Sequence, residues 1–178
     1  MQARGLLMIE HRLIEKMLAV IRAKLKLAEQ ELAIDPYFVD AAVDFIRVYA
    51  DRTHHGKEED ILFRELKRID LSADDLKRMN ELIAEHVFGR QTTQTLVEAN
   101  RRYRDGDQAA LAQVIDCLKT LAAFYPKHIK KEDDVFFPAA HQYFSAEEDQ
   151  ALLAEFYEFD RKMIHAKYAA VVEALGGR

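Results

Sequence analysis

Apolar residues recur at steps of three and four along most of the chain, and short breaks separate these stretches. Such spacing places apolar side chains on one face of an α-helix. Start and stop signals for helices stand at Asp35-Pro36, Ser72-Ala73-Asp74-Asp75, Asp105-Gly106-Asp107 and Ser145-Ala146-Glu147-Glu148. The pattern therefore predicts five helices, of which the first runs from about Leu6 to Leu32 and the second from Pro36 to about Ile69.

The connections between the predicted helices are short, roughly two to eight residues, so consecutive helices should run antiparallel. The first four helices, over about residues 6–140, then form an up-down-up-down four-helix bundle, and the fold class is all-α. A fifth helix over about residues 146–174 is expected to cover the bundle or to form a homodimer contact. We find no second domain in the pattern, so residues 1–178 are predicted to be a single domain.

The composition narrows the chemistry of any functional site. A net charge of −5 offers no basic surface for nucleic acid or for an anionic membrane. No apolar run is long enough for a signal peptide or a membrane span, so we expect a cytoplasmic protein. One cysteine against seven histidines excludes a cysteine-based metal site in one chain. A transition-metal site would have to use histidine and carboxylate ligands.

Each of the four bundle helices carries one histidine on its predicted apolar face, and two of these are followed by glutamate four residues later. The four histidines stand at similar distances from the connecting loops, so they should lie at one level of the bundle. Buried carboxylates are costly without a cation, and no Lys or Arg lies on those apolar faces at the same level. The alternative is a set of hydrogen-bonded core histidines and helix ion pairs. The pattern favours a metal site formed by His11, His55, Glu59, His86, His128 and Glu132.

Six such ligands are too many for one tetrahedral zinc ion and suit two ions that prefer six ligands, iron or alternatively manganese. We expect His11 and His55 on one ion, His86 and His128 on the other, and Glu59 and Glu132 as bridges. A bridging oxide or hydroxide would reduce the remaining positive charge. Each ion would keep a position for water, dioxygen or another small molecule.

The combination His11, His55-x-x-x-Glu59, His86 and His128-x-x-x-Glu132 resembles the hemerythrin-like, or HHE cation-binding, domain. The segments 54–60 and 128–133 carry most of this resemblance. It implies a non-haem di-iron centre that binds dioxygen, nitric oxide or an azide-like anion. The implied roles are sensing of these molecules or of iron, protection against oxidative or nitrosative stress, and repair of iron centres.

Two departures from the family pattern bear on the role. Oxygen-carrying members have a second histidine four residues after the one in the third helix, where this chain has Arg90. This weakens an oxygen-storage role. The repair proteins carry a further N-terminal domain with cysteines, which these residues do not supply. A di-iron oxidase or peroxidase and a structural metal-bundle module stay as alternatives, and the sequence does not separate an enzyme from a binding protein.

Several neighbours of the predicted ligands are candidates for supporting roles. His54 and Glu58 form a second pair beside His55 and Glu59, and a shift of one residue in helical register would bring either inward. Asp133 is an alternative to Glu132 as a bridge. Gly89 would leave room for a small ligand, and the Tyr125 hydroxyl would either point toward that ligand or belong to the plain core.

Overall fold

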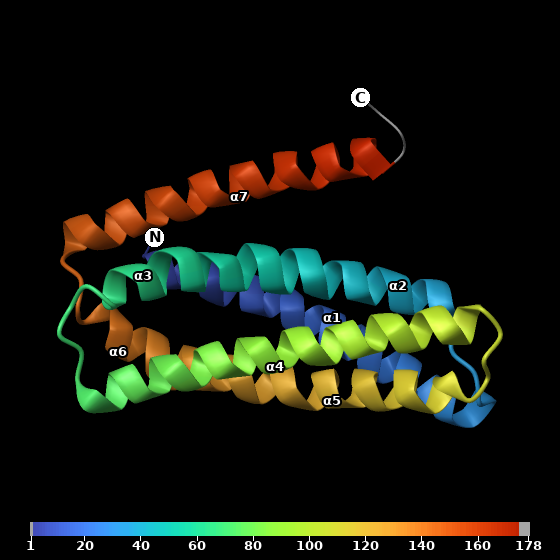
Figure 1. Ribbon diagram of the computed structural model, residues 1–178. Coiled ribbons are helices and arrows are strands. Elements are labelled where there is room, and N and C mark those ends of the chain that lie inside the picture. The colour runs from blue at the N-terminus through green and yellow to red at the C-terminus, as the bar shows by residue number, and fades with distance from the viewer. Residues whose placement is uncertain (1, 175–178) are drawn as a thin grey trace.

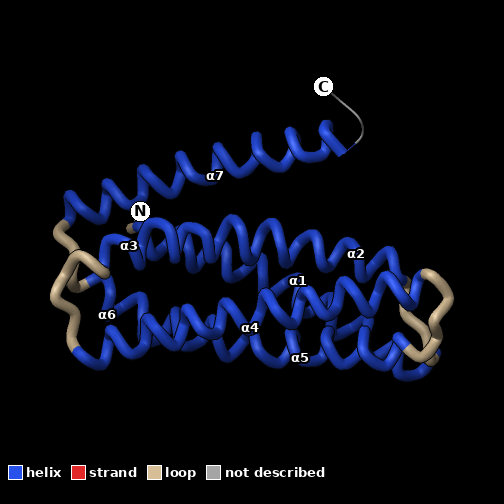
Figure 2. Tube along the Cα trace, viewed as in Figure 1, coloured by secondary structure: helices blue, strands red, loops and turns tan. Residues whose placement is uncertain are grey.

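The computed structural model describes residues 2–174, and five long helical rods make up most of this part of the chain. Four rods lie side by side and alternate in direction, and the fifth runs along the outside of the bundle (Figure 1). Short loops join the rods at the two ends of the bundle (Figure 2). The predicted all-α bundle with an additional C-terminal helix is confirmed.

The first rod is α1 (Ala3–Glu31). The second consists of α2 (Pro36–Asp44), the π-helical segments η1 (Phe45–His55) and η2 (Glu58–Leu62), and α3 (Phe63–Leu66). The third is α4 (Ala73–Arg104). The fourth consists of α5 (Ala110–Lys131), the π-helical segment η3 (Glu132–Phe136) and α6 (Phe137–His141), and the fifth is α7 (Ala146–Ala174).

Side-chain caps fix three of the helix starts. The Asp35 carboxylate accepts a hydrogen bond from the Tyr37 backbone N–H at 2.9 Å, and the Ser72 hydroxyl accepts one from the Asp75 N–H at 3.1 Å. Ser145 and Glu148 bond reciprocally, each side chain accepting from the backbone N–H of the other. These bonds satisfy N–H groups that have no partner within the first turn of a helix.

The second rod departs from the regular α-helical period that its sequence suggested. In an α-helix each step of four residues drifts by about 40° around the axis, so a long row of such steps leaves the core face. The i→i+5 hydrogen bonds of a π-helix hold one more residue per turn and reduce this drift. Residues spaced four apart therefore stay on the inner face throughout, and the buried row is Ile46, Ala50, His54, Glu58, Leu62 and Leu66.

Some apolar residues of the second rod consequently lie away from the inner face. Ala41 is exposed, and Phe45 and Val48 are only half-buried. A similar change occurs in η3, where Phe136 is buried (1% exposed) and Val135 lies outside at 41%. The π turn moves the residues that follow it around the axis, which places Phe136 inward and Val135 outward.

Two apolar clusters fill the bundle and leave a polar layer between them. One cluster includes Ile14, Ala50 and Leu96, and the other includes Leu7, Ile61 and Leu82. In each of the first three rods, the histidines lie in sequence between the residue named for one cluster and the residue named for the other. These histidines therefore lie between the two clusters. The second cluster also takes up Leu152, Leu153 and Phe156 of α7, which attach that helix to the bundle. Among the described residues, we find no helix that is both long enough and apolar enough to span a membrane.

Candidate metal centre

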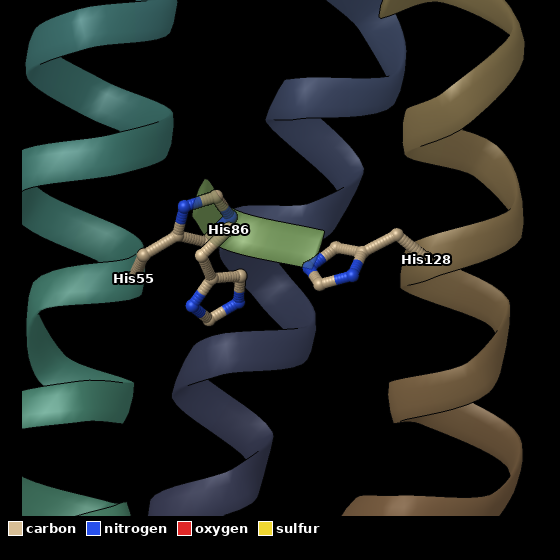
Figure 3. A group of neighbouring side chains, drawn as sticks. All are labelled: His55, His86 and His128. Carbon is tan, nitrogen blue, oxygen red and sulfur yellow. The ribbon is translucent and has the colours of Figure 1, made fainter. Parts of the chain in front are cut away.

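Seven buried side chains of the polar layer form two groups with the composition of metal sites. In each group one ligand atom per residue lies within 4.8 Å of the others. The first group is His11, His54, Glu58 and Glu132, and the second is His55, His86 and His128. Figure 3 shows the second group, in which imidazole rings from three different helices point toward one another.

The two glutamates connect the groups. Glu58 places Oε1 at 3.5 Å from His54 Nε2 and Oε2 at 3.3 Å from His86 Nε2. Glu132 places Oε2 at 3.2 Å from His11 Nε2 and Oε1 at 3.3 Å from His128 Nε2. Each carboxylate thus offers one oxygen to each group, which is the arrangement of a ligand that bridges two metal ions.

Six of the inward-facing atoms lack hydrogen bonds, whereas the Nε2 atoms of His11 and His54 lie 2.8 Å apart, within hydrogen-bond distance of each other. Both carboxylate oxygens of Glu58 and of Glu132, together with the Nε2 atoms of His86 and His128, are buried without a hydrogen-bond partner among the described residues. Burying a carboxylate in this way costs several kcal/mol unless a cation compensates. Five imidazoles and two carboxylates are nitrogen and oxygen donors suited to iron or manganese. The donor set therefore fits a pair of such ions.

An outer ring of carboxylates orients all five histidines. Each imidazole directs Nδ1 away from the centre toward an acidic side chain: His11 to Asp133 at 2.7 Å, His54 to Glu10 at 2.9 Å, His55 to Asp51 at 3.4 Å, His86 to Glu59 at 2.6 Å and His128 to Glu85 at 2.8 Å. A carboxylate accepts, so Nδ1 of each imidazole carries a hydrogen, and Nε2 is the ring nitrogen directed toward the centre. This outer bond is the usual support of a metal-binding histidine.

The pKa values of the central groups reflect their mutual charges. Burial alone would lower the pKa of His11, but the neighbouring carboxylates of Asp133 and Glu132 raise it to about 10. Burial opposes the charged form of His86 as well, and the carboxylates of Glu132, Glu58 and Glu59 still raise its pKa to about 11. The metal-free centre thus holds two protonated imidazoles that balance its carboxylates.

The structure brings five of the six residues that the sequence singled out into the two groups, and Glu59 stays outside. Its side chain is 26% exposed and accepts from His86 Nδ1 and from Arg90. Glu58, with no exposed side-chain surface, takes the position that we expected for Glu59. His54 joins His11, and His55 lies with His86 rather than with His11. The π turns of η1 and η2 cause this change of register.

The other supporting candidates have definite partners. Asp133 contacts Nδ1 of His11 and also the guanidinium of Arg12, so it supports a ligand and is not a member of either group. Arg90 donates to Asp51 at 2.7 Å and to Glu59 at 2.6 Å. The guanidinium therefore ties together two carboxylates that themselves face histidines.

Sequence reasoning missed three of the outer carboxylates, Glu10, Asp51 and Glu85. Two of them share a signal that could have revealed them. Glu10 directly precedes His11 and reaches His54 in the next rod, and Glu85 directly precedes His86 and reaches His128. The repeated Glu-His dipeptide is therefore the sign of a carboxylate that supports the histidine of the neighbouring helix.

A cavity of about 370 Å³ reaches the second group from the surface. Its walls include Asp51, His55, Gly89, Arg90 and Tyr125. A Cβ atom on Gly89 would lie 3.9 Å from the Tyr125 hydroxyl oxygen and 3.5 Å from a ring carbon of Phe124. These are ordinary contact distances, so a methyl group fits at Gly89 and a larger side chain would extend into the cavity.

Residues 3–140 match the family model described as hemerythrin HHE cation binding domain. The matched region covers the four rods of the bundle except for the last residue of α6, contains all seven residues of the two groups, and ends before α7. A comparison with curated proteins and a comparison with solved structures gave no match.

Proposed function

This chain belongs to the hemerythrin HHE cation-binding family, and we propose on that premise that it is a non-haem di-iron protein that binds a small ligand at its metal centre. His11 and His54 would hold one ion, His55, His86 and His128 the other, and Glu58 and Glu132 would bridge them. The observation that carries the proposal is the orientation of the Glu58 and Glu132 carboxylates. Each directs one oxygen to a histidine of the first group and the other oxygen to a histidine of the second group.

The ligand we propose is dioxygen, nitric oxide or an azide-like anion. An ion that prefers six ligands would keep one free position if it were held by three imidazoles and two carboxylate oxygens. An ion held by two imidazoles and two carboxylate oxygens would keep two free positions. Bound iron supplies a redox-active ion at which such ligands can be held. A role in sensing, in stress protection or in iron-centre repair is the corresponding physiological proposal.

The cavity beside His55 supports a ligand that accepts hydrogen bonds. Tyr125 is buried there, and burial together with the negative charge of Asp51 raises the pKa of its hydroxyl. The phenol therefore stays protonated and can donate to a ligand in the cavity. Arg90 forms part of the same wall and adds positive charge, which favours anions.

Metal analysis and optical spectroscopy test the proposed function. Protein purified without added metal should contain two iron ions per chain, with manganese as the alternative. After anaerobic reduction, addition of oxygen should produce a charge-transfer absorption that disappears reversibly when oxygen is removed. Consumption of reductant with turnover would support the oxidase or peroxidase alternative, and bound metal without any response would support a structural module.

Substitution of Gly89 tests whether the cavity is the ligand-binding site. We expect Gly89→Leu to weaken azide binding by at least about tenfold, equivalent to ~1.4 kcal/mol, because its side chain fills the space beside Tyr125. Gly89→Ala is the matched control and should bind azide normally, since its methyl group makes only ordinary contacts. Titration of azide followed optically, with metal content measured in parallel, checks both. Equal azide affinity in Gly89→Leu and the unaltered protein would refute the assignment.

Metal binding should also release protons. Loading the metal-free protein with ferrous iron at pH 7 should release about two protons per chain, because protonated His11 and His86 must lose their protons to bind a cation. For the same reason the apparent affinity should rise with pH below about 10. An indicator dye in weak buffer measures the release. A His11→Gln variant should release one proton fewer, and uptake of iron without proton release would contradict the expectation.

Our predictions of the cellular location and of the binding partners rest on the sequence alone. A cytoplasmic location, the lack of nucleic-acid and membrane partners, and a homodimer contact through the fifth helix remain predictions.

A further inference from the structure

A continuous line of charged side chains connects α7 with the metal centre. His54 directs Nδ1 to Oε2 of Glu10 at 2.9 Å. The other oxygen of Glu10 accepts from the Lys57 ammonium, and the same ammonium donates to Asp160 of α7 at 2.5 Å. The order is therefore His54, Glu10, Lys57, Asp160.

Lys57 at the middle of this line has no exposed side-chain surface. A buried ammonium is costly unless acidic groups surround it, and Glu10 and Asp160 are the two carboxylates that pair with it. Glu10 is shared, since it also holds His54. If Asp160 lost its charge, Lys57 would depend on Glu10 alone, and the hold of Glu10 on His54 would weaken.

Beside this line, α7 packs closely against the second rod. A Cβ atom on Gly56, the residue before Lys57, would lie 2.8 Å from a ring carbon of Phe159, the residue before Asp160. The backbone of the second rod and the Phe159 ring therefore approach as closely as a glycine allows. Phe156, one turn earlier in α7, is completely buried. These contacts fix the position of α7 along the second rod, so that Asp160 lies beside Lys57.

The position of α7 in the chain separates this feature from the family domain. The family match ends at residue 140, and α7 begins at Ala146. In Figure 1 the helix runs along the outside of the bundle, on the side where η1 and η2 lie. The carboxylate that completes the line thus comes from outside the matched region.

We propose that α7 supports the metal centre directly. Asp160 and Lys57 are positioning residues that keep His54 in its metal-binding orientation through Glu10. The inference rests on the proposed function, because it concerns retention of the ion at His11 and His54. The ion at His55, His86 and His128 has no such link among the described contacts of those three residues. By reciprocity, metal at the first position stabilises the docking of α7, so this helix reports whether that position is filled.

Asp160→Asn tests the inference with little risk to folding, since the side chain is partly exposed. Its matched control is Glu155→Gln, also in α7, which loses the negative charge and one of the two hydrogen bonds that Arg64 donates at 2.9 and 2.8 Å, and Glu155 does not touch the line to His54. Both variants and the unaltered protein are loaded with ferrous iron without oxygen, and release to a chelator is followed. In Asp160→Asn one of the two ions should leave about tenfold faster, the scale typical of lost support behind a metal-binding histidine.

Hydrogen exchange of the α7 amides supplies a second measurement. Loading with iron should slow this exchange in the unaltered protein and in Glu155→Gln, and the difference should vanish in Asp160→Asn. Release from Asp160→Asn at the unaltered rate would overturn the inference. Equal acceleration of both ions in both variants would also overturn it, because α7 would then be only a cover. If the unaltered protein bound no iron at all, the proposed function itself would fail, and that result is distinct from the other two.

Discussion

Replacement of Glu58 by Gln should remove most of the bound metal, whereas replacement of its neighbour Glu59 by Gln should leave two ions per chain under saturating conditions. Glu58 has no exposed side-chain surface and directs its two oxygens to His54 and His86, which belong to different groups. A neutral amide cannot offset the charge of two cations or bridge them through two equivalent oxygens. Both groups should therefore lose affinity together.

Glu59 acts differently although it is adjacent in sequence. Its carboxylate supports His86 from the outside, through Nδ1 at 2.6 Å. Loss of such support typically lowers metal affinity by about 10–100-fold and leaves the ligand in place. Metal content per chain after desalting, together with circular dichroism to verify the fold, compares the two variants. Similar losses in both, or a larger loss in Glu59→Gln, would contradict the proposed role of Glu58 as a bridging ligand.

Removal of the metal should produce the second large effect, a marked loss of stability without loss of the bundle. A ligand that binds only the folded state at a thousandfold excess over Kd stabilises it by about 4 kcal/mol, so two ions contribute about 8 kcal/mol. For a domain of this size that corresponds to a fall in Tm of at least about 15 °C. The metal-free protein should stay folded because an apolar cluster lies on each side of the polar layer.

Thermal unfolding at fixed free metal concentration measures this difference. The Glu58→Gln variant is the internal control, because its Tm should hardly depend on added metal. A metal-independent Tm in the unaltered protein would mean that the buried carboxylates of Glu58 and Glu132 are compensated by something other than cations.

The positions of the helices were largely predictable because their signals are local. Capping side chains such as Asp35, Ser72 and Ser145 act within a few residues of the chain, and the structure shows each making the expected bond. The expectation that histidines of four rods meet at one level required only helix lengths and short loops. His11, His55, His86 and His128 do lie in the same polar layer.

The identity of one glutamate could not be obtained in the same way. The sequence contains the pairs His54-His55 and Glu58-Glu59. With a constant α-helical period, the second member of each pair, His55 and Glu59, lies on the predicted apolar face of the helix. The π turns of η1 and η2 place both histidines inward, in different groups, and select Glu58 over Glu59. Whether a helix adopts an i→i+5 turn depends on the packing of its neighbours, which one segment does not encode by itself.

The sequence by itself determined an all-α bundle, a layer of histidine and glutamate at its centre, and the family to which the chain belongs, because periodicity, caps and motif spacing are properties of short segments. The tertiary structure alone decided the register of the second rod, the division of seven candidate ligands into two groups, the outer carboxylates and the link from Asp160 to His54. The physical reason is that these features depend on the rotation of one helix against another. A change of one residue in that rotation exchanges buried and exposed side chains.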